Sequence, residues 1–499
     1  MKKTKNYSKK RYSILNFVEG VNCDDNEYFL KNGVSKNCYN IKVSKGNLTK
    51  GRGIEELSLP QLQTSTSFNR KLNYSSEYRL TKLWRYKYYS EVNSRYDYIL
   101  IGYGTDKKLH YVNLFAYSQS VYDIGGFTFN EEPTALNFRI NGKDVIGFCS
   151  PSDSLLVWYC DEAPYQVTTV PKFDSICLHN ERLFAIDSEK NYLVRYSSNL
   201  NPLDWTSNIT TTSGGTIELN DYKGLLRNLV SFLDNVYVFR DFGISKISSY
   251  ASNSVYTAVN IYNSSAKIYC KTACICGDQI YFLAEDGLFK FDGFNVIKVE
   301  IKLSKLFNNI SQENAITCFF NGKLYIACAL EFEDDESVGQ EVESGRVNNA
   351  LIEYDIVSKE YNILRGIDIT SMLAVKDLNL SKLLICLNNS YGYKCWELCE
   401  TGTLNGSILL KKWESGKIHF DKFDSDKVLK EVNLICKYDC LLKIETDYGL
   451  NIYEIKGKED LQRIRLNCIG KIFSFVFESN NKNFFISSPQ FVFNVEKEN

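Results

Sequence analysis

Short runs of alternating apolar and polar residues, each bounded by a polar turn, recur along most of this chain. The stretch RLFAIDSEKNYLVRYSSNLNPLDW, residues 182–205, reads as two strands around a polar turn, followed by a loop that an aromatic residue closes. The first aliphatic residue of each related phrase lies 38 to 60 positions after the previous one, at Ile99, Val145, Leu183, Val236, Ile280, Leu324 and Leu384. A spacing of this size accommodates four strands.

Repeats of this length that consist only of strands are typical of propeller blades. A single four-stranded sheet cannot bury both of its faces, but a closed ring of such sheets can. We therefore predict an all-β fold with a β-propeller of about seven degenerate blades over residues 57–405. No phrase carries the Gly-His and Trp-Asp marks of WD40 repeats or an obvious kelch signature. The pattern leaves stacked sandwiches and a β-solenoid open as alternatives.

The pattern changes at both ends of the chain. Residues 1 to about 14 are basic and predict a solvated tail, and the following short apolar pieces mixed with Gly and Asn predict an extended segment. Residues 1–56 are thus expected to form an N-terminal arm that lies on something larger. After about residue 405 the strands alternate strictly, with Phe473, Phe475 and Phe477 on one face. Residues 406–499 therefore predict a C-terminal antiparallel sheet or β-sandwich, packed on or woven into the ring.

The composition supports strands and gives no overall electrostatic preference. The chain has 34 Tyr and 30 Phe beside 7 Pro and 2 Met, which favours strands over helices. The net charge of −1 produces no general attraction to nucleic acid or acidic lipid. No apolar stretch resembles a signal peptide or a membrane span, so we expect the chain to fold in the cytoplasm where it is made.

The 16 cysteines sit mostly inside strand-like runs, as small hydrophobic residues do. We expect them to stay free thiols in a reducing compartment. The closest pairs, Cys274 with Cys276 and Cys436 with Cys440, lack a second ligand pair at zinc-site spacing. The sequence predicts no metal site and no cofactor.

No familiar catalytic or phosphate-binding motif is present. The sequence lacks HExxH, GxSxG, GxxxxGK[ST] and a GxGxxG after a strand, so we predict that the protein is not an enzyme. Residues 70–95 form the one basic region with interleaved aromatic residues, as single-strand nucleic-acid binders have. Strands packed through Tyr with basic side chains outward explain this stretch equally well. The candidate phosphate or DNA contacts in it are Arg79, Lys82, Arg85 and Lys87.

Three stretches resemble bacteriophage virion proteins. Residues 16–53 combine a Phe17-Val18-Glu19-Gly20 start with a glycine-rich close around Leu48 and Arg52, similar to the segment that precedes the propeller in those proteins. Residues 181–205 resemble a blade that ends in an Asn/Asp-Pro-x-x-Trp element, and residues 463–479 resemble their last strands. The group most similar to this chain is the tail-hub, or packaged-DNA stabilisation, type of propeller protein of short-tailed phages.

This resemblance implies a structural, non-enzymatic part of a virion: a tail hub, connector or baseplate component that forms a ring with copies of itself around the tail axis. It implies assembly in the bacterial host cytoplasm, contacts with other tail or portal proteins, a candidate contact with packaged DNA, and no membrane partner. The arm is the expected subunit contact, through Phe17, Tyr39-Asn40, Leu48 and Arg52, with the C-terminal sheet second. The alternatives are a host-receptor or carbohydrate-binding propeller at the tail tip, and a propeller hydrolase that uses central carboxylates.

Overall fold

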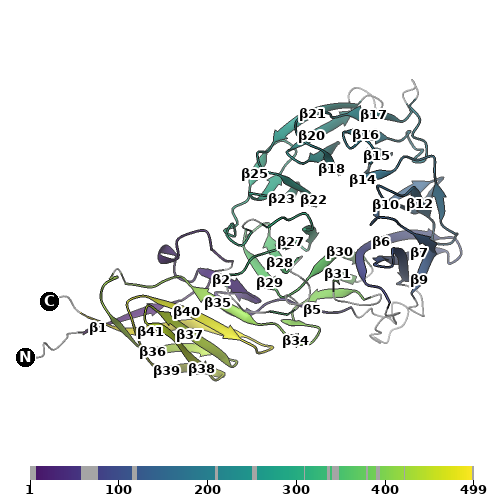
Figure 1. Cartoon of the computed structure of the whole chain (residues 1–499). Coiled ribbons are helices and arrows are strands. Elements are labelled where there is room, and N and C mark those ends of the chain that lie inside the picture. The colour runs from purple at the N-terminus through teal and green to yellow at the C-terminus, as the bar shows by residue number, and fades with distance from the viewer. Residues whose placement is uncertain are drawn as a thin grey trace, which may run out of the picture.

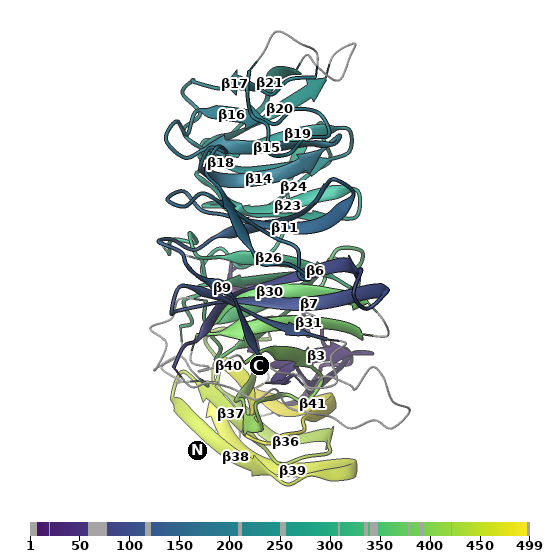
Figure 2. The ribbon, with the colours of Figure 1, turned by 90° about the vertical axis from the view of Figure 1, so that its right-hand side faces the viewer.

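Six four-stranded antiparallel sheets and one six-stranded sheet follow one another around a ring in the computed structural model of the chain (Figure 1). The structure describes residues 7–18, 20–57, 77–114, 121–207, 212–249, 256–307, 310–333, 338–339, 348–377, 380–388, 394–420 and 422–496. The prediction of a β-propeller with about seven blades, an N-terminal arm and a C-terminal sandwich is confirmed. Figure 2 shows the blades edge-on, with the sandwich at one end.

The first six blades are each built from four consecutive strands, ordered from the centre of the ring outwards. Blades one to three are β6 (Leu80–Ser90), β7 (Arg95–Gly104), β8 (Lys108–Asn113), β9 (Tyr122–Thr128); β10 (Thr134–Ile140), β11 (Lys143–Cys149), β12 (Leu155–Trp158), β13 (Tyr165–Val167); β14 (Phe173–His179), β15 (Arg182–Asp187), β16 (Leu193–Tyr196), β17 (Gly215–Glu218). Blades four to six are β18 (Leu226–Phe232), β19 (Asn235–Arg240), β20 (Gly243–Ser249), β21 (Tyr256–Asn263); β22 (Ile268–Cys276), β23 (Gln279–Ala284), β24 (Gly287–Phe291), β25 (Val296–Lys298); β26 (Ile316–Phe320), β27 (Lys323–Cys328), β28 (Ala350–Asp355), β29 (Tyr361–Arg365). Each repeated phrase in the sequence therefore begins at the second strand of a blade.

The seventh blade closes the ring with a strand from the other end of the chain. Its strands are β30 (Ile369–Asp377), β31 (Leu380–Leu387), β32 (Trp396–Cys399) and β5 (Gly53–Glu56), with the short hairpin β33 (Thr403–Leu404) and β34 (Ser407–Ile408) beyond. Ile54 of β5 lies opposite Leu398 and is fully buried. The backbone N–H of Leu83 in the first blade donates to Ser371 Oγ of the seventh at 3.2 Å. The first and last blades are thus joined directly.

The arm and the C-terminal strands together form a two-sheet sandwich beside the ring (Figure 1). One sheet is β3 (Ile41–Ser44), β4 (Asn47–Lys50), β41 (Phe485–Glu496), β36 (Lys427–Cys436) and β39 (Lys458–Gly470), with β1 (Tyr7–Ser13) also on β41. The other is β2 (Ser35–Tyr39), β35 (Lys411–Ser415), β40 (Phe473–Ser479), β37 (Cys440–Thr446) and β38 (Gly449–Ile455). Neither sheet can therefore form from the C-terminal residues alone.

The core between the two sandwich sheets is aromatic. Phe473, Phe475 and Phe477 are fully buried, as their alternation predicts, and the Phe475 ring stacks on Phe491 at 3.7 Å. Tyr12 packs on the same two rings, at 6.3 and 6.4 Å. This packing explains why residues 7–13 form strand β1, where the basic composition predicted a solvated tail; that expectation is wrong for these residues.

The described part of the chain has one helical element, the 3-10 turn η1 (Glu27–Phe29). The described residues therefore contain no helix with the length and apolar character needed to cross a membrane.

Candidate functional site

The face of the ring that carries the turn between the first and second strand of each blade is called here the first-turn face. Because neighbouring strands in each blade are antiparallel, the loops between third and fourth strands lie on the same face. A cavity of about 550 Å³ and two of about 620 and 310 Å³ are the candidates for a functional site in the described residues. The 620 Å³ cavity opens on the first-turn face between the first three blades and is called the turn pocket.

Two tight turns shape the rim of the turn pocket. Asn141 and Gly142 join β10 to β11 with φ values of +50° and +83°, and Asn180 and Glu181 join β14 to β15 with +45° and +63°. Two successive left-handed residues give the two-residue hairpin whose twist matches that of the flanking strands. Leu178 lies on β14, two residues before Asn180; it is 41% exposed and forms part of the pocket wall.

The loop that carries the Asn-Pro-x-x-Trp element forms another wall. Leu200 has a φ of +58°, and its N–H donates to the carbonyl of Glu181 at 3.2 Å, which fixes its largely exposed side chain at the pocket rim. Trp205 Nε1 donates to the carbonyl of Pro202 at 2.9 Å, and its ring lies 4.7 Å from that of Phe173. Asp204 accepts from Ser198 Oγ at 2.7 Å. The element therefore holds the loop rigidly against its own blade and presents Leu200 and Pro202 to the pocket.

Charged groups on the rim are partly neutralised. Arg139 Nε lies 2.6 Å from Asp144 Oδ1, and both residues line the pocket. Lys87 Nζ lies 4.7 Å from the ring centre of Tyr96 and 5.3 Å from that of Tyr98, within cation–π range. The pocket thus combines an apolar wall with both signs of charge, which suits an amphiphilic ligand or an apolar side chain of a protein partner.

The structure does not gather the four candidate phosphate contacts into one patch. All four lie on or next to β6, and Arg79 and Lys87 are separated by roughly 26 Å along the strand. Arg79 Nη1 donates to the carbonyl of Asn388 at 2.9 Å, and Lys82 Nζ is paired with Glu132 at 3.0 Å. The carbonyl of Arg85 accepts from Asn137 Nδ2 at 3.1 Å. Of the four, Lys87 alone lines the turn pocket.

The residues expected to contact a neighbouring subunit lie inside their own chain. Phe17 is 3% exposed and packs edge-on against Trp413 at 4.9 Å, and Leu48 is fully buried in the same sandwich core. Tyr39 is fully buried, with the guanidinium of Arg365 over its ring at 4.7 Å. The arm therefore packs within its own subunit, where its strands connect the sandwich to the ring; this connection is called here the clasp. A contact with a neighbouring subunit would need other side chains.

Asn40 and Arg52 join the sandwich to the ring. The Asn40 side chain accepts from the Arg365 N–H at 2.8 Å and donates to the carbonyls of Arg365 and Leu410 at 3.2 and 2.7 Å. Arg52 Nε lies 2.9 Å from Glu353 Oε2 of the sixth blade, and its Nη1 lies 2.5 Å from Glu400 Oε1. Burial alone would raise the pKa of Glu353, but hydrogen bonds and charge from Arg52 and Lys323 hold it below the ordinary value of 4.5. No local sequence signal identifies Asn40 as the residue that covers the outer strand of the sixth blade.

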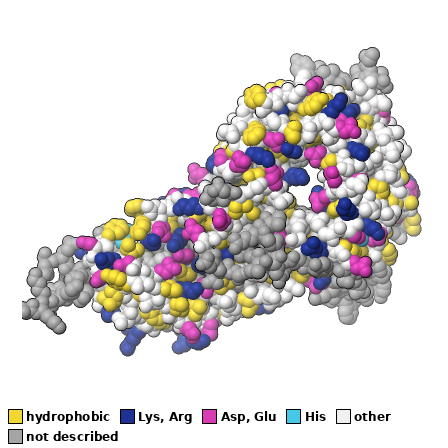
Figure 3. All heavy atoms as spheres, in the orientation of Figure 1, with side chains coloured by type: hydrophobic (Ala, Val, Ile, Leu, Met, Phe, Trp, Pro, Cys, Tyr) yellow, Lys and Arg dark blue, Asp and Glu magenta, His cyan; other side chains and the backbone are white. Residues whose placement is uncertain are grey.

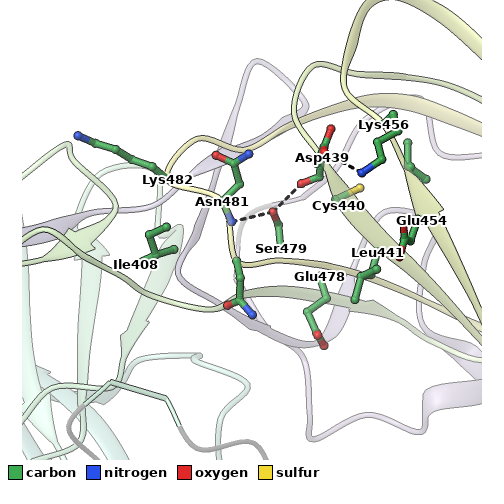
Figure 4. Close-up of a pocket in the computed structure, with 12 residues that line it drawn as sticks. Ile408, Asp439, Cys440, Leu441, Glu454, Lys456, Glu478, Ser479, Asn481 and Lys482 are labelled. Carbon is green, nitrogen blue, oxygen red and sulfur yellow. Dashed lines mark hydrogen bonds and ion pairs between the residues drawn. The ribbon is translucent and has the colours of Figure 1, made fainter.

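A second cavity, of about 550 Å³, lies in the cleft between β34 and the sandwich and is called the joint cleft (Figure 4). Its acidic side chains are largely neutralised: Asp439 pairs with Lys456 at 3.2 Å, and Glu478 pairs with Lys443 at 2.8 Å. The Gly457 N–H and Lys456 lower the pKa of Asp439. A general acid needs a raised pKa, so Asp439 is not suited to that role.

The third cavity, of about 310 Å³, lies among the starts of the inner strands of the middle blades. Burial raises the pKa of Asp174 there, while Lys271 and Arg227 oppose the shift. The other two carboxylates in the lining, Asp241 and Glu313, are ion-paired with Arg227 and Lys267. The pair of available carboxylates that glycoside hydrolysis requires is therefore not assembled in this cavity.

Most of the cysteines lie within strands and pack there as small hydrophobic groups. Burial raises the pKa of the Cys149, Cys318 and Cys395 thiols to about 12. Cys436 Sγ and Cys440 Sγ lie 3.4 Å apart as free thiols at the edge of the joint cleft. Among the residues described, no group of three or more His, Cys, Asp or Glu side chains could hold a metal ion.

No protein-family model and no curated protein matches this sequence. Among solved structures, the chain is similar to the β-propeller Hsv2 of Kluyveromyces lactis, at 10% identity over 54% of this chain and 81% of that one, with a TM-score of 0.33. It is also similar to the β-propeller BBS1N in a crystal structure of its complex with ARL6DN, at 8% identity over 70% of this chain and 99% of that one, with a TM-score of 0.40. The fold assignment rests on the order of the sheets and the closure of the ring, which define a propeller clasped to a β-sandwich.

Proposed function

We propose that this chain is a non-enzymatic structural component of a phage virion, a tail hub, connector or baseplate protein that assembles with copies of itself around the tail axis. The observation that carries the proposal is the clasp: strands from both ends of the chain fasten the ring and the sandwich into one body. A part that transmits force between neighbours must keep its modules in fixed relative positions, and β5, Asn40 and Arg52 serve that purpose here. The resemblance of residues 16–53, 181–205 and 463–479 to phage virion proteins supplies the context.

Apolar side chains on the first-turn face support a docking role. Five of them, each more than half exposed, sit on the turns of five different blades: Val92, Leu200, Leu233, Phe294 and Val357. A single exposed apolar residue is ordinary, but several on one face are typical of a surface that meets another protein. We infer that this face contacts another tail or portal protein of the virion, assembled in the host cytoplasm.

A contact with packaged DNA is the second part of the proposal. Figure 3 shows both basic and acidic side chains around the opening of the ring, so neither sign of charge dominates there. Because the four basic residues lie spread out on or next to β6, and Arg79 and Lys82 bond to protein groups, one subunit offers no continuous phosphate track. Any DNA contact would have to combine residues of several subunits.

The alternative function is a host-receptor or carbohydrate-binding propeller at the tail tip. The turn pocket favours it, because about 620 Å³ falls within the range of small-ligand sites. Asn137, Asp144 and Glu181 provide the amide and carboxylate groups that hydrogen-bond hydroxyls there.

The decisive experiment is to locate the chain in purified virions of its phage. Mass spectrometry of gradient-purified particles should find it at a fixed copy number per portal ring, and cryo-electron microscopy should place a seven-bladed density at the tail axis. A phage-encoded replication protein serves as the control for carry-over from the lysate. If the chain stays in the lysate with that control, the virion proposal fails.

A paired set of variants separates the two functions. Leu200→Asp with Leu233→Asp should abolish co-sedimentation with the partner tail protein, whereas Tyr222→Asp, a largely exposed site on the opposite face, should leave it intact. Asn137→Ala with Glu181→Ala should abolish binding on a glycan array if the tail-tip alternative holds. Glycan binding by the isolated wild-type subunit, without any ring or tail partner, would favour the alternative.

A further inference from the structure

Two cysteines meet where the chain passes from one sheet of the sandwich to the other. Cys436 is the last residue of β36 and Cys440 is the first residue of β37, and these strands belong to different sheets. Their Sγ atoms lie 3.4 Å apart, and both thiols are free. Because a disulfide bond is about 2.0 Å long, a small rotation of the two side chains would bring the sulfurs into bonding distance. The pair is therefore placed for a disulfide that would tie the two sheets together.

Hydrogen bonds hold the turn between these cysteines in place. Cys436 Sγ donates to the carbonyl of Tyr438 at 3.0 Å, and Gln462 Nε2 donates to the carbonyl of Cys436 at 3.0 Å. Ser479 Oγ donates to the carbonyl of Asp439 at 2.8 Å. Because the turn is fixed from several strands, the two sulfurs are kept facing each other, which favours a reaction between them.

The pair also has an access route and a reactive thiol. Cys440 lines the joint cleft, so a small molecule in the cleft reaches the two sulfurs (Figure 4). The hydrogen bond from the Cys440 thiol lowers the pKa of Cys436, although burial opposes the shift. Burial instead raises the pKa of Cys318 to about 12. Because the thiolate is the nucleophilic form, Cys436 is the more reactive of these thiols.

The other close pair in the sequence lacks this geometry. Cys274 and Cys276 lie on the same strand, β22, opposite Tyr281 and Gln279 in regular register. Two residues apart on a strand, their Cα atoms are separated by about 6.8 Å, the upper limit for a disulfide. A hydrogen bond from Cys276 also lowers the pKa of Cys274, so the two pairs differ in geometry and not in the direction of this shift.

We propose that Cys436 and Cys440 form a disulfide when the native chain meets a peroxide, which makes the pair a redox-sensitive link between the sandwich sheets. The Cys436 thiolate attacks one peroxide oxygen, the O–O bond breaks, and the released hydroxide takes the thiol proton to give water. The Cys440 sulfur then attacks the sulfenic sulfur of Cys436. The S–S bond forms, the S–O bond breaks, and hydroxide leaves with the Cys440 proton as a second water.

Two thiols thus lose two electrons, which the peroxide gains. A reducing cytoplasm keeps the link open, and oxidising surroundings outside the cell close it. The proposal is independent of any role in a virion, because it concerns the isolated chain.

The test maps disulfides in the native full-length chain. The reduced protein is freed of reductant, treated with hydrogen peroxide, unfolded in the presence of N-ethylmaleimide and digested with trypsin. Because trypsin cleaves after Lys437, residues 431–437 and 438–443 should appear as one linked species that a reductant separates. If both peptides are recovered alkylated, or if Cys436 is linked to another cysteine, the proposal is overturned.

Two internal controls come from the same digest. The peptide 272–290 contains Cys274 and Cys276 and should carry two alkyl groups after the peroxide treatment. Cys436 should be oxidised at least about tenfold faster than Cys318, because a larger fraction of it is thiolate. Equal rates at both thiols would show unselective oxidation and would contradict the proposal.

Single variants test the order of the steps. Cys440→Ser should leave the sulfenic acid on Cys436, which dimedone traps, and should give no linked species. Cys399→Ser, a half-buried cysteine of the seventh blade, is the matched control and should form the link as the wild type does. If a serine variant does not fold, peptide mapping of the wild-type chain still decides the proposal.

Discussion

The ring and the sandwich bury aromatic cores of the same kind but are assembled from the chain in opposite ways. Six of the seven blades consist of four consecutive strands, so their contacts are local in sequence. The sandwich pairs strands from residues 7–50 with strands from residues 411–496, as where β1 runs antiparallel to β41. The described strands of the arm, β1 to β5, therefore belong structurally with the C-terminal part of the chain.

This difference predicts where the protein is most easily broken. A blade of consecutive strands forms its contacts between residues that are close in sequence. The seventh blade and both sandwich sheets instead require strands several hundred residues apart to come together, which costs more chain entropy. Changes in the arm should therefore cost more than comparable changes in a middle blade.

The largest expected effect is from deleting residues 1–57. The deletion removes β5 from the seventh blade and four strands from the sandwich, and it uncovers the outer strand of the sixth blade. The loss should exceed the roughly 5–15 kcal/mol that stabilises a typical domain, so the truncated chain should be insoluble or unfolded. Soluble yield and circular dichroism measure this. A truncated chain that melts at the wild-type temperature would show that the arm is dispensable.

Phe17→Ala should lower the free energy of unfolding by about 3–5 kcal/mol, because it removes a buried ring that packs on Trp413. Leu15→Ala, two residues away and 72% exposed, is the matched control and should stay within about 0.5 kcal/mol. Urea denaturation followed by tryptophan fluorescence compares the two. Equal costs for both substitutions would place the arm outside the core.

Glu353→Gln should cost about 2 kcal/mol at neutral pH, because it removes charged hydrogen bonds to Arg52 and Lys323 at the joint. The folded pKa of Glu353 lies below its unfolded value of 4.5. Its contribution is therefore complete above the unfolded pKa and is lost as the pH falls through the folded one. Unfolding free energies measured at several pH values should show the wild-type advantage shrinking below about pH 4.5. An advantage that stays constant down to acid unfolding would rule out this ion pair as its source.

Lys411→Met should change the pH dependence on the alkaline side. Lys411 is fully buried, donates to the carbonyls of Leu409 and Gly402 at 3.0 and 3.3 Å, and has a pKa that burial lowers to about 8. Because the unfolded state binds more protons above this value, wild-type stability should rise by about 2 kcal/mol between about pH 7.5 and 9.5, relative to the variant. Parallel pH profiles for the two proteins would contradict a buried, titrating lysine.

The blades could be predicted from sequence because each one is a local pattern. The phrase from Asp278 to Gly293, for example, contains β23, its turn and β24 within 16 consecutive residues. The closing strand could not be recognised, because Gly53–Glu56 is four residues long and its partner β32 begins more than 300 positions later. Nothing in a local pattern encodes such a pairing.

The candidate site was predicted only in part, for a similar reason. The apolar residues of the arm indicated that it is buried. Their pattern does not reveal whether the covering surface belongs to the same chain or to a neighbouring subunit. In the structure, Phe17 and Leu48 are buried by residues of their own chain. Lys87 and the Asn-Pro-x-x-Trp loop were each visible in the sequence. Their meeting at the turn pocket depends on how the first three blades are arranged around the ring.

The clasp is tested most directly by hydrogen exchange of the native full-length chain, read by mass spectrometry on peptides covering β1–β5. These peptides should exchange as slowly as β35–β41, and the peptide that contains β5 should match the one that contains β32. If the arm peptides exchange within seconds while the C-terminal strands stay protected, the arm is not an integral part of the sandwich and the seventh blade.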